Sequence, residues 1–258
     1  MKEQDDTQLK IIGGYWSQRS AGFSEYAMEH LDEDRRGLYF RRIKAFATGR
    51  RLTVLDIGCG PGIFSVVLGR DGHQVTGIDY SDGMIDQARK NCRQAGVPAD
   101  IRKMDAHHLM FPDASFDLIV SRRVVWNLED PVQAYREWLR VLRPNGRMIL
   151  FDGNYFLSMH DKEYRQNLEK FQRNHPQEDL TPEQQAKLNQ GADPTIRDQF
   201  AKKLPLSFLR RPAWDTGILL ELGAASVCAE TDTSAPAPDG SGRLLPQTFV
   251  LTVLKQIE

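Results

Sequence analysis

The stretch VLDIGCGPG, residues 54–62, decides the fold of this 258-residue chain. An apolar run over 52–57 ends directly at a cluster of three glycines and a proline. Such a run indicates a short, buried strand of a parallel sheet. Glycines at its end indicate that the backbone turns sharply and comes close to another group, because glycine has no Cβ atom.

Four further segments have the character of strands, and amphipathic helical stretches separate them. The five predicted strands cover residues 52–57, 74–79, 100–105, 116–121 and 147–152. This alternation predicts βαβ units, and therefore an α/β fold with a doubly wound, mostly parallel sheet. Ligands of such sheets bind beyond the carboxyl ends of the strands. Four acidic residues stand at these ends: Asp56, Asp79, Asp105 and Asp152.

The boundaries of several elements can also be predicted. Ser81 is expected to cap one helix, and Asp130 followed by Pro131 is expected to begin another. The sequence RPNG, residues 143–146, predicts a turn before the fifth strand. Near the end of the chain, GILLELGAASVC and TFVLTVLK predict a helix and two strands, joined by a surface loop over 231–246. These two strands are expected to be antiparallel and to complete a seven-stranded sheet.

The composition is that of an ordinary globular protein. The chain is 40% hydrophobic, and 34 basic residues balance 35 acidic ones, so the net charge is −1. A nucleic-acid-binding protein usually has a basic excess, and this sequence has none. Three cysteines without a C-x-x-C pair predict neither disulfides nor a zinc site. No apolar run suits a signal peptide or a membrane span, so we expect a cytoplasmic protein.

Three explanations compete for the glycine loop. A phosphate-binding Walker A loop needs a Lys-Ser or Lys-Thr pair that is absent here. A dinucleotide loop needs G-x-G-x-x-G, but Ile63 stands where the third glycine should be. A purely structural turn would explain one glycine, and would leave the other two and the acid at Asp56 without a reason.

The sequence DIGCGPG, residues 56–62, resembles motif I of the class I S-adenosylmethionine-dependent methyltransferases. The resemblance extends over roughly residues 50–155, where FPDASFDLIVS (111–121) is similar to a second pattern of the family, and it resumes weakly over 213–258. Within the class, the chain resembles the small-molecule, UbiE or methyltransferase type 11-like group. The resemblance implies a Rossmann-like fold, S-adenosylmethionine as cofactor and S-adenosylhomocysteine as product.

The resemblance also implies roles for residues around the loop. Gly58 and Gly60 would let the backbone approach the amino-acid and ribose parts of the cofactor, and Asp56 would order the loop near the methionine amino group. Asp79, 23 positions after Asp56, would accept hydrogen bonds from both ribose hydroxyls. The alternative for Asp79 is an acid that only favours the start of the following helix.

Other residues would hold the two ends of the cofactor. Tyr80 and Met84 would flank the adenine, although the helical spacing of Met84 also suits a core position. Asp105 and Ala106 would offer a carboxylate and a backbone amide to the adenine. Arg122 would line the methionine part.

The N-terminal stretch YWSQRSAGFSEY, residues 15–26, resembles a segment that precedes the core in one group of these enzymes. By that resemblance, Arg19 would pair with the cofactor carboxylate, a geometry that guanidinium groups favour. Tyr15 or Tyr26 would cover the methyl end. The alternative is a surface helix that packs on the edge of the sheet.

The sequence identifies no catalytic residue. The candidate general bases are His107, His108, His160, Asp152 and Tyr26. A base is needed only if the acceptor atom starts protonated. Trp126 and Asn127 could line the substrate side, or Trp126 could fill the core. No three Cys, His, Asp or Glu residues have the spacing of a metal site.

These observations predict a division of the chain and a function. We expect an N-terminal helical cap (1–50), an S-adenosylmethionine-binding core (51–153), a helical lid insertion (154–212) and C-terminal strands that complete the sheet (213–258). The insertion could instead be a solvated decoration. The expected activity is in-line methyl transfer to a small molecule by a monomer or homodimer, with no nucleic-acid or membrane partner. The alternatives are an NAD-type oxidoreductase and a non-catalytic S-adenosylmethionine-binding protein.

Overall fold

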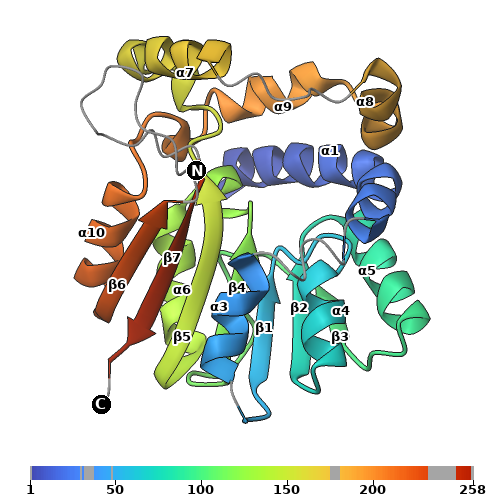
Figure 1. Cartoon of the computed structure of the whole chain (residues 1–258), viewed down its shortest axis with the longest axis vertical. Helices are drawn as coiled ribbons and strands as arrows, with labels where there is room; N and C mark the ends of the chain where they lie inside the picture. The colour runs from blue at the N-terminus through green and yellow to red at the C-terminus, as the bar shows by residue number, and fades with distance from the viewer. Residues whose placement is uncertain are drawn as a thin grey trace.

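One seven-stranded sheet forms the centre of the computed structural model, which describes residues 2–29, 31, 38–47, 49–174, 181–231 and 248–256 (Figure 1). The strands are β1 (Thr53–Ile57), β2 (Gln74–Asp79), β3 (Asp100–Lys103), β4 (Phe116–Arg122), β5 (Leu142–Gly153), β6 (Ala224–Thr231) and β7 (Thr248–Lys255). Their order is β3-β2-β1-β4-β5-β7-β6. The first five are parallel, and β7 is antiparallel to both β5 and β6. The predicted doubly wound, mostly parallel sheet is confirmed.

Helices cover both faces of this sheet. The helices of the described residues are α1 (Lys2–Glu29), α3 (Leu38–Ala47), α4 (Ile63–Arg70), α5 (Asp82–Gln94), α6 (Pro131–Val141), α7 (Lys162–Asn174), α8 (Pro182–Asn189), α9 (Pro194–Ala201) and α10 (Ala213–Glu221), with short 3-10 turns η1 (Val125–Asn127), η2 (Leu157–Met159) and η3 (Pro205–Ser207). Helices α3, α4 and α5 pack on the face to which Val54 points. Helices α6 and α10 pack on the opposite face, to which Leu55 points. Adjacent strand residues thus enter different cores, as the pleat of a strand requires.

The predicted helix starts are confirmed. The Ser81 hydroxyl caps α5 by accepting a hydrogen bond from the backbone N–H of Met84 at 3.3 Å. The Asp130 carboxylate caps α6 by accepting a hydrogen bond from the backbone N–H of Gln133, and Pro131 is the first residue of the helix. Both caps satisfy backbone N–H groups that have no partner inside the helix.

The RPNG segment differs from its prediction. Strand β5 already begins at Leu142, opposite Phe116, and its regular register with β4 resumes at Arg147. Residues 143–146 therefore form a bulge within the strand and not a turn ahead of it. Pro144 has no N–H to donate to the sheet, and Asn145 has a left-handed φ of 61°, so neither residue continues a regular ladder. The predicted surface loop over 231–246 lies, apart from Thr231, outside the described residues.

The carboxyl ends of the parallel strands lie beneath a helical layer. Helix α1 runs across this edge of the sheet, and α7, α8 and α9, from the insertion between β5 and β6, lie beyond it (Figure 1). An aromatic cluster joins α1, η1 and α9 through Tyr15, Trp126 and Phe200. Within the described part of the chain, none of the helices has the length and apolar character that a membrane crossing requires.

Candidate active site

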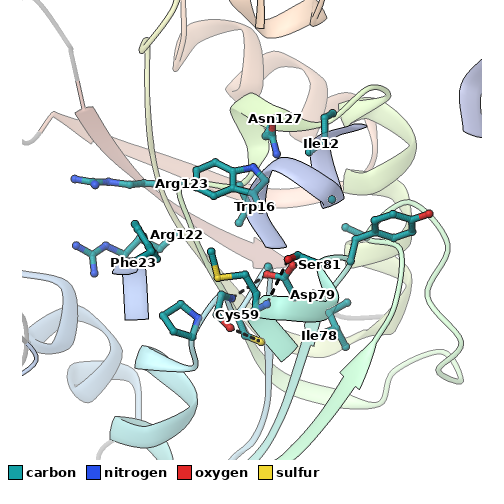
Figure 2. Close-up of a pocket in the computed structure, with 18 of the residues that line it drawn as sticks. Ile12, Trp16, Phe23, Cys59, Ile78, Asp79, Ser81, Arg122, Arg123 and Asn127 are labelled. Carbon is teal, nitrogen blue, oxygen red and sulfur yellow. Dashed lines mark hydrogen bonds between the residues drawn. The ribbon is translucent and has the colours of Figure 1, made fainter. Parts of the chain in front are cut away.

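A cavity of about 420 Å³ opens at the carboxyl ends of the neighbouring strands β1 and β4, beneath helix α1 (Figure 2). The direction of the strand order reverses at this point, which is where ligands of doubly wound sheets bind. The glycine loop and the residues after β2 form its floor, and α1 forms its roof. With one exception, every residue for which the sequence predicts a cofactor contact lines this cavity.

Gly58 and Gly60, the two glycines predicted to let the cofactor approach, have different surroundings. Gly60 has a left-handed φ of 54°, and a Cβ atom there would meet no atom within 4 Å. Its backbone therefore faces open space in the cavity wall. Gly58 is also left-handed, but a Cβ atom there would lie 2.2 Å from Val124 Cγ2. The close approach that requires glycine at position 58 is thus to the segment after β4.

The Asp79 carboxylate holds the loop in place. One oxygen accepts a hydrogen bond from the Gly60 N–H at 2.9 Å, and the other accepts one from the Ser81 N–H at 2.9 Å (Figure 2). Burial in the cavity wall raises the pKa of Asp79, and these backbone bonds oppose the rise. Asp79 therefore joins the loop to the start of α5 while its carboxylate lines the cavity.

Asp56 is the most deeply buried acid of the cavity wall, with 2% exposure. One of its oxygens accepts hydrogen bonds from the backbone N–H and the hydroxyl of Ser65, at 3.0 and 2.7 Å. Burial raises the pKa of Asp56 to about 7, although the bonds from Ser65 oppose the rise. Asp56 thus orders the loop by binding the first turn of α4.

The loop after β3 carries Asp105 and Ala106 to the same cavity. The Asp105 carboxylate accepts a hydrogen bond from the backbone N–H of His107 and lies 2.7 Å from His107 Nδ1. The Asp130 N–H donates to His107 Nε2, so Nδ1 carries the ring proton and donates to Asp105. Burial acts to raise the pKa of Asp105, but the bonds from His107 outweigh it and the pKa is lowered.

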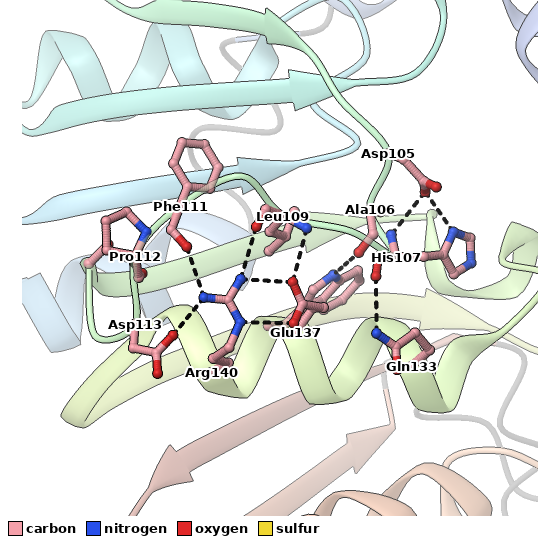
Figure 3. Close-up of polar contacts among 12 residues, drawn as sticks. Asp105, Ala106, His107, Leu109, Phe111, Pro112, Asp113, Gln133, Glu137 and Arg140 are labelled. Atoms are coloured by element: carbon pink, nitrogen blue, oxygen red, sulfur yellow. Dashed lines mark hydrogen bonds and ion pairs between the residues drawn. The ribbon is translucent and has the colours of Figure 1, made fainter.

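Helix α6 fixes this loop from below (Figure 3). The Trp138 indole N–H donates to the Ala106 carbonyl at 2.9 Å, and the Gln133 amide donates to the His107 carbonyl. Arg140 binds the carbonyls of Leu109 and Phe111. Because the Glu137 carboxylate also accepts a hydrogen bond from the Leu109 N–H, four side chains of one helix hold the loop that offers Ala106 to the cavity.

Helix α1 contributes Arg19, which is 6% exposed and lines the cavity. Its Nη1 donates to the Tyr15 hydroxyl at 3.2 Å, whereas its buried Nε has no hydrogen-bond partner among the described residues. Tyr15 does not line the cavity, so the prediction that it contacts the cofactor is not supported by its position. Its ring packs edge-on against Phe200 of α9, and its hydroxyl holds Arg19.

The remaining predicted residues complete the wall. Tyr80 lies directly under α1, because a Cβ atom on Gly13 would come within 2.8 Å of its ring. Met84 is 3% exposed, and Arg122 stands at the end of β4; both line the cavity. Tyr26 lines it as well.

The candidate bases separate into two groups. His107 and Tyr26 line the cavity, but both ring nitrogens of His107 are engaged by Asp105 and Asp130. The other candidates lie outside the cavity wall: His108, His160 and Asp152. Among the described residues, no group of three or more His, Cys, Asp or Glu side chains could hold a metal ion.

Several lining residues were not predicted from the sequence. Trp16 and Phe23 come from α1, Tyr155 and Phe156 from the segment after β5, and Arg197 from α9. For Trp16 and Phe23, the resemblance of the 15–26 stretch indicates the segment but not these individual residues. Nothing in the sequence pattern indicates Arg197, because it reaches the cavity only through the packing of the insertion. Trp126, with 7% exposure, both lines the cavity and belongs to the aromatic cluster.

Part of the chain is similar in sequence to known methyltransferases. The chain is 35% identical over 112 residues to the phosphatidylethanolamine N-methyltransferase of Cereibacter sphaeroides, a match that covers 43% of this chain and 55% of that protein. It is 37% identical over 95 residues to the ubiquinone biosynthesis O-methyltransferase of Methylobacterium sp. strain 4-46, covering 37% of this chain and 38% of that protein. The matches thus span about half or less of the length of these relatives.

Solved structures share the fold over most of the chain. A SAM-dependent methyltransferase from Methanosarcina mazei superposes with a TM-score of 0.53 at 21% identity, covering 84% of this chain and 98% of that one. One from Aquifex aeolicus gives a TM-score of 0.51 at 17% identity, covering 83% and 88%. Residues 55–150 match the family model described as a methyltransferase domain. This part of the chain is therefore similar to methyltransferase domains, and the chain shares the fold of solved S-adenosylmethionine-dependent methyltransferases.

Proposed function

We propose that the protein transfers a methyl group from S-adenosylmethionine to a small-molecule acceptor. The observation that carries the proposal is the position of the glycine loop. Gly60 and the Asp79 carboxylate face one cavity at the switch point of the sheet, and helix α1 covers that cavity. The volume of about 420 Å³ lies in the range of small-molecule sites.

The residues present suit this cofactor. Asp79 offers a carboxylate that can accept hydrogen bonds from ribose hydroxyls, and the open space at Gly60 leaves room beside the backbone. Arg19 has a buried Nε without a partner among the described residues, which suits the carboxylate of an amino acid. Tyr80, Met84 and Ala106 supply an apolar wall for a planar base.

The chain itself is proposed to align the cofactor with the acceptor, to enclose both and to exclude water. When bound, the cofactor would supply an electrophilic methyl group on a positively charged sulfur: the acceptor atom bonds to the methyl carbon in line with the breaking C–S bond, and a neutral thioether leaves. Trp16, Trp126 and Phe156 place apolar surface along the cavity, and a water-poor wall favours a step in which positive charge disappears. Orientation of two reactants can contribute about 7–11 kcal/mol to lowering a barrier.

The acceptor is proposed to be a small molecule and not a nucleic acid. The cavity lies under α1 and the helices of residues 154–212, which we propose act as a lid over it. The balance of 34 basic and 35 acidic residues gives no general attraction for a polyanion.

Binding measurements on the full chain test the proposal. Calorimetry with S-adenosylhomocysteine should show saturable binding, and Asp79→Asn should raise the Kd by about tenfold or more, because it replaces a charged acceptor. Asp86→Asn, an exposed residue of α5 outside the cavity, is the matched control and should bind like the wild type. Binding of NADH in place of S-adenosylhomocysteine would contradict the proposal.

Turnover tests the enzymatic part separately. The protein is incubated with S-adenosylmethionine and panels of small alcohols, amines, thiols and acids, and release of S-adenosylhomocysteine is measured. Acceptor-dependent release is expected. A protein that binds the cofactor but methylates no acceptor would be a binding protein and not an enzyme.

A further inference from the structure

The charged side chains of the cavity are separated into two ends. The carboxylates of Asp56 and Asp79 lie at the ends of β1 and β2, and that of Asp105 lies in the loop after β3. Arginines come from the other walls: Arg19 from α1, Arg122 and Arg123 from the end of β4 and Arg197 from α9. Figure 2 shows Arg122 and Arg123 extending to the same side, away from Asp79.

The two ends differ in the hydrogen-bond and ion-pair partners that the protein provides for their charged groups. Asp56 and Asp79 already accept two hydrogen bonds each from the protein. At the arginine end, Arg197 pairs with its own neighbour, Asp198, through Nε and Nη2 at 3.0 and 2.8 Å. The described residues place no carboxylate within ion-pair distance of the Arg19 or Arg123 side chain. This end of the cavity therefore has more positive than negative charge.

Aromatic rings connect two of these guanidinium groups. Arg19 lies 5.3 Å from the centre of the Trp16 ring, and Arg197 lies 5.6 Å from that of Phe156. Between them, Trp126 lies 6.4 Å from Trp16 and 4.9 Å from Phe156, measured between ring centres. The rings form one continuous apolar surface with a cation at each end.

The two guanidinium groups also influence each other. Burial lowers the pKa of Arg19, and the positive charge of Arg197 lowers it further. Like charges held near each other in a partly buried wall are stabilised by an anion placed between them.

The cofactor alone does not supply the missing negative charge. S-adenosylmethionine has a carboxylate, an ammonium and a sulfonium group, so its binding adds net positive charge. Its single carboxylate can be bound by the fork of one guanidinium, for which Arg19 is placed. Arg123 and Arg197 remain for another ligand.

We propose, resting on the methyltransferase function above, that the acceptor is an oxyanion with an apolar or aromatic body. Arg197 and Arg123 bind its carboxylate or phosphate group, and its body lies on the surface formed by Trp126 and Phe156. Arginine suits this role because its planar fork matches the geometry of both kinds of oxyanion. The positive end of the cavity disfavours cationic amines as acceptors.

A probe-binding experiment tests the proposal on the full chain saturated with S-adenosylhomocysteine. Benzoate, phenyl phosphate, benzyl alcohol and benzylamine share a ring and differ in charge. Their binding is followed by tryptophan fluorescence, since Trp16 and Trp126 line the site, and by calorimetry. At least one anion should bind, and more tightly than the alcohol and the amine. The comparison of benzoate with phenyl phosphate shows which oxyanion is preferred.

Substitutions connect the binding to the named residues. Arg197→Gln and Arg123→Gln should each weaken binding of the anion by about tenfold, because each removes a charge-assisted bond. Arg165→Gln, an exposed arginine of the same insertion, should change it by less than about twofold. Thermal melts establish that each variant is folded, and the two independent variants keep the test valid if one of them is unstable.

The outcomes distinguish the two proposals. A protein that does not bind S-adenosylhomocysteine would overturn the methyltransferase function, and with it the acceptor class. If the cofactor product binds, the acceptor class alone is overturned by any of three results: neither anion binds, the alcohol or amine binds as tightly as the anions, or Arg197→Gln and Arg123→Gln both bind them like the wild type.

Discussion

At the scale of single residues, Asp56 links the site to the pH dependence of folding. Its pKa is about 7 in the folded protein against an ordinary value of 3.8, because the carboxylate is buried. Between pH 3.8 and about pH 7, the folded state keeps a proton that the unfolded state releases. The free energy of unfolding of the wild type therefore falls as the pH rises through this range. Asp56→Asn does not titrate and should remove this contribution.

We therefore expect Asp56→Asn to gain stability relative to the wild type between pH 5 and pH 8. The relative gain should be on the order of 2–3 kcal/mol. Urea unfolding of both proteins at the two pH values measures it. Asp86→Asn, exposed on α5, should show no such change. An equal difference between Asp56→Asn and wild type at both pH values would contradict the assignment.

Residues at strand ends are the ones whose place the sequence predicts best. Asp56 and Asp79 end neighbouring parallel strands, so the strand pattern alone brings them to one edge. It is harder to predict which contact requires a particular residue type at a position. Gly58 is needed for contact with Val124, and Tyr15 points to Phe200 of α9, and both partners are distant in sequence. Local pattern contains no information about such contacts.

At the scale of elements, the contact between α1 and α8 positions the roof of the cavity. Gly22 of α1 faces the end of α8, where a Cβ atom would lie 2.1 Å from the Lys187 carbonyl oxygen. Since this neighbour is backbone, the two helices would have to move apart. The Lys187 ammonium also pairs with Glu25 of α1 at 2.8 Å.

Gly22→Ala should therefore weaken cofactor binding, because α1 carries Arg19 and Trp16. Overpacking of this kind typically costs about 1–3 kcal/mol, so the Kd for S-adenosylhomocysteine should rise severalfold and the melting temperature should fall. Gly14→Ala on the same helix is the control. A Cβ atom there meets nothing within 4 Å, so alanine should leave binding unchanged and stabilise the helix by up to about 1 kcal/mol. Equal behaviour of the two variants would contradict the role of this contact.

Individual elements are predictable where local chemistry determines them. The capping box at Thr181 follows such a local pattern: its hydroxyl accepts from the Gln184 N–H, and the Gln184 side chain accepts from the Thr181 N–H. The same local rules place the strands and helix starts of the core. They do not predict that residues 143–146 form a bulge within β5, because the bulge depends on pairing with β4.

At the scale of the whole molecule, a buried ionic network connects the end of the insertion to the sheet. Arg211, which precedes α10, is completely buried; its Nη1 lies 3.4 Å from the Asp152 carboxylate at the end of β5. Its Nη2 lies 2.8 Å from Asp215 of α10, and the Tyr135 hydroxyl of α6 donates to the same carboxylate at 2.6 Å. The sequence predicts the sheet and the extent of the insertion, but not this network, because it joins side chains up to 80 positions apart.

Arg211→Met should destabilise the whole fold, because it leaves Asp152 and Asp215 buried without their cation. Breaking a buried pair typically costs about 3–5 kcal/mol of the free energy of unfolding. The loss should be smaller at pH 5 than at pH 8, since burial already raises the pKa of Asp152 and protonation can neutralise it. Arg210→Met is the matched control: this neighbour is 60% exposed, pairs with Asp161 and Glu163 at the surface, and should lose no more than about 1 kcal/mol. Urea unfolding of both variants at the two pH values makes the comparison, and equal losses would show that Arg211 does not hold the insertion to the sheet through its charge.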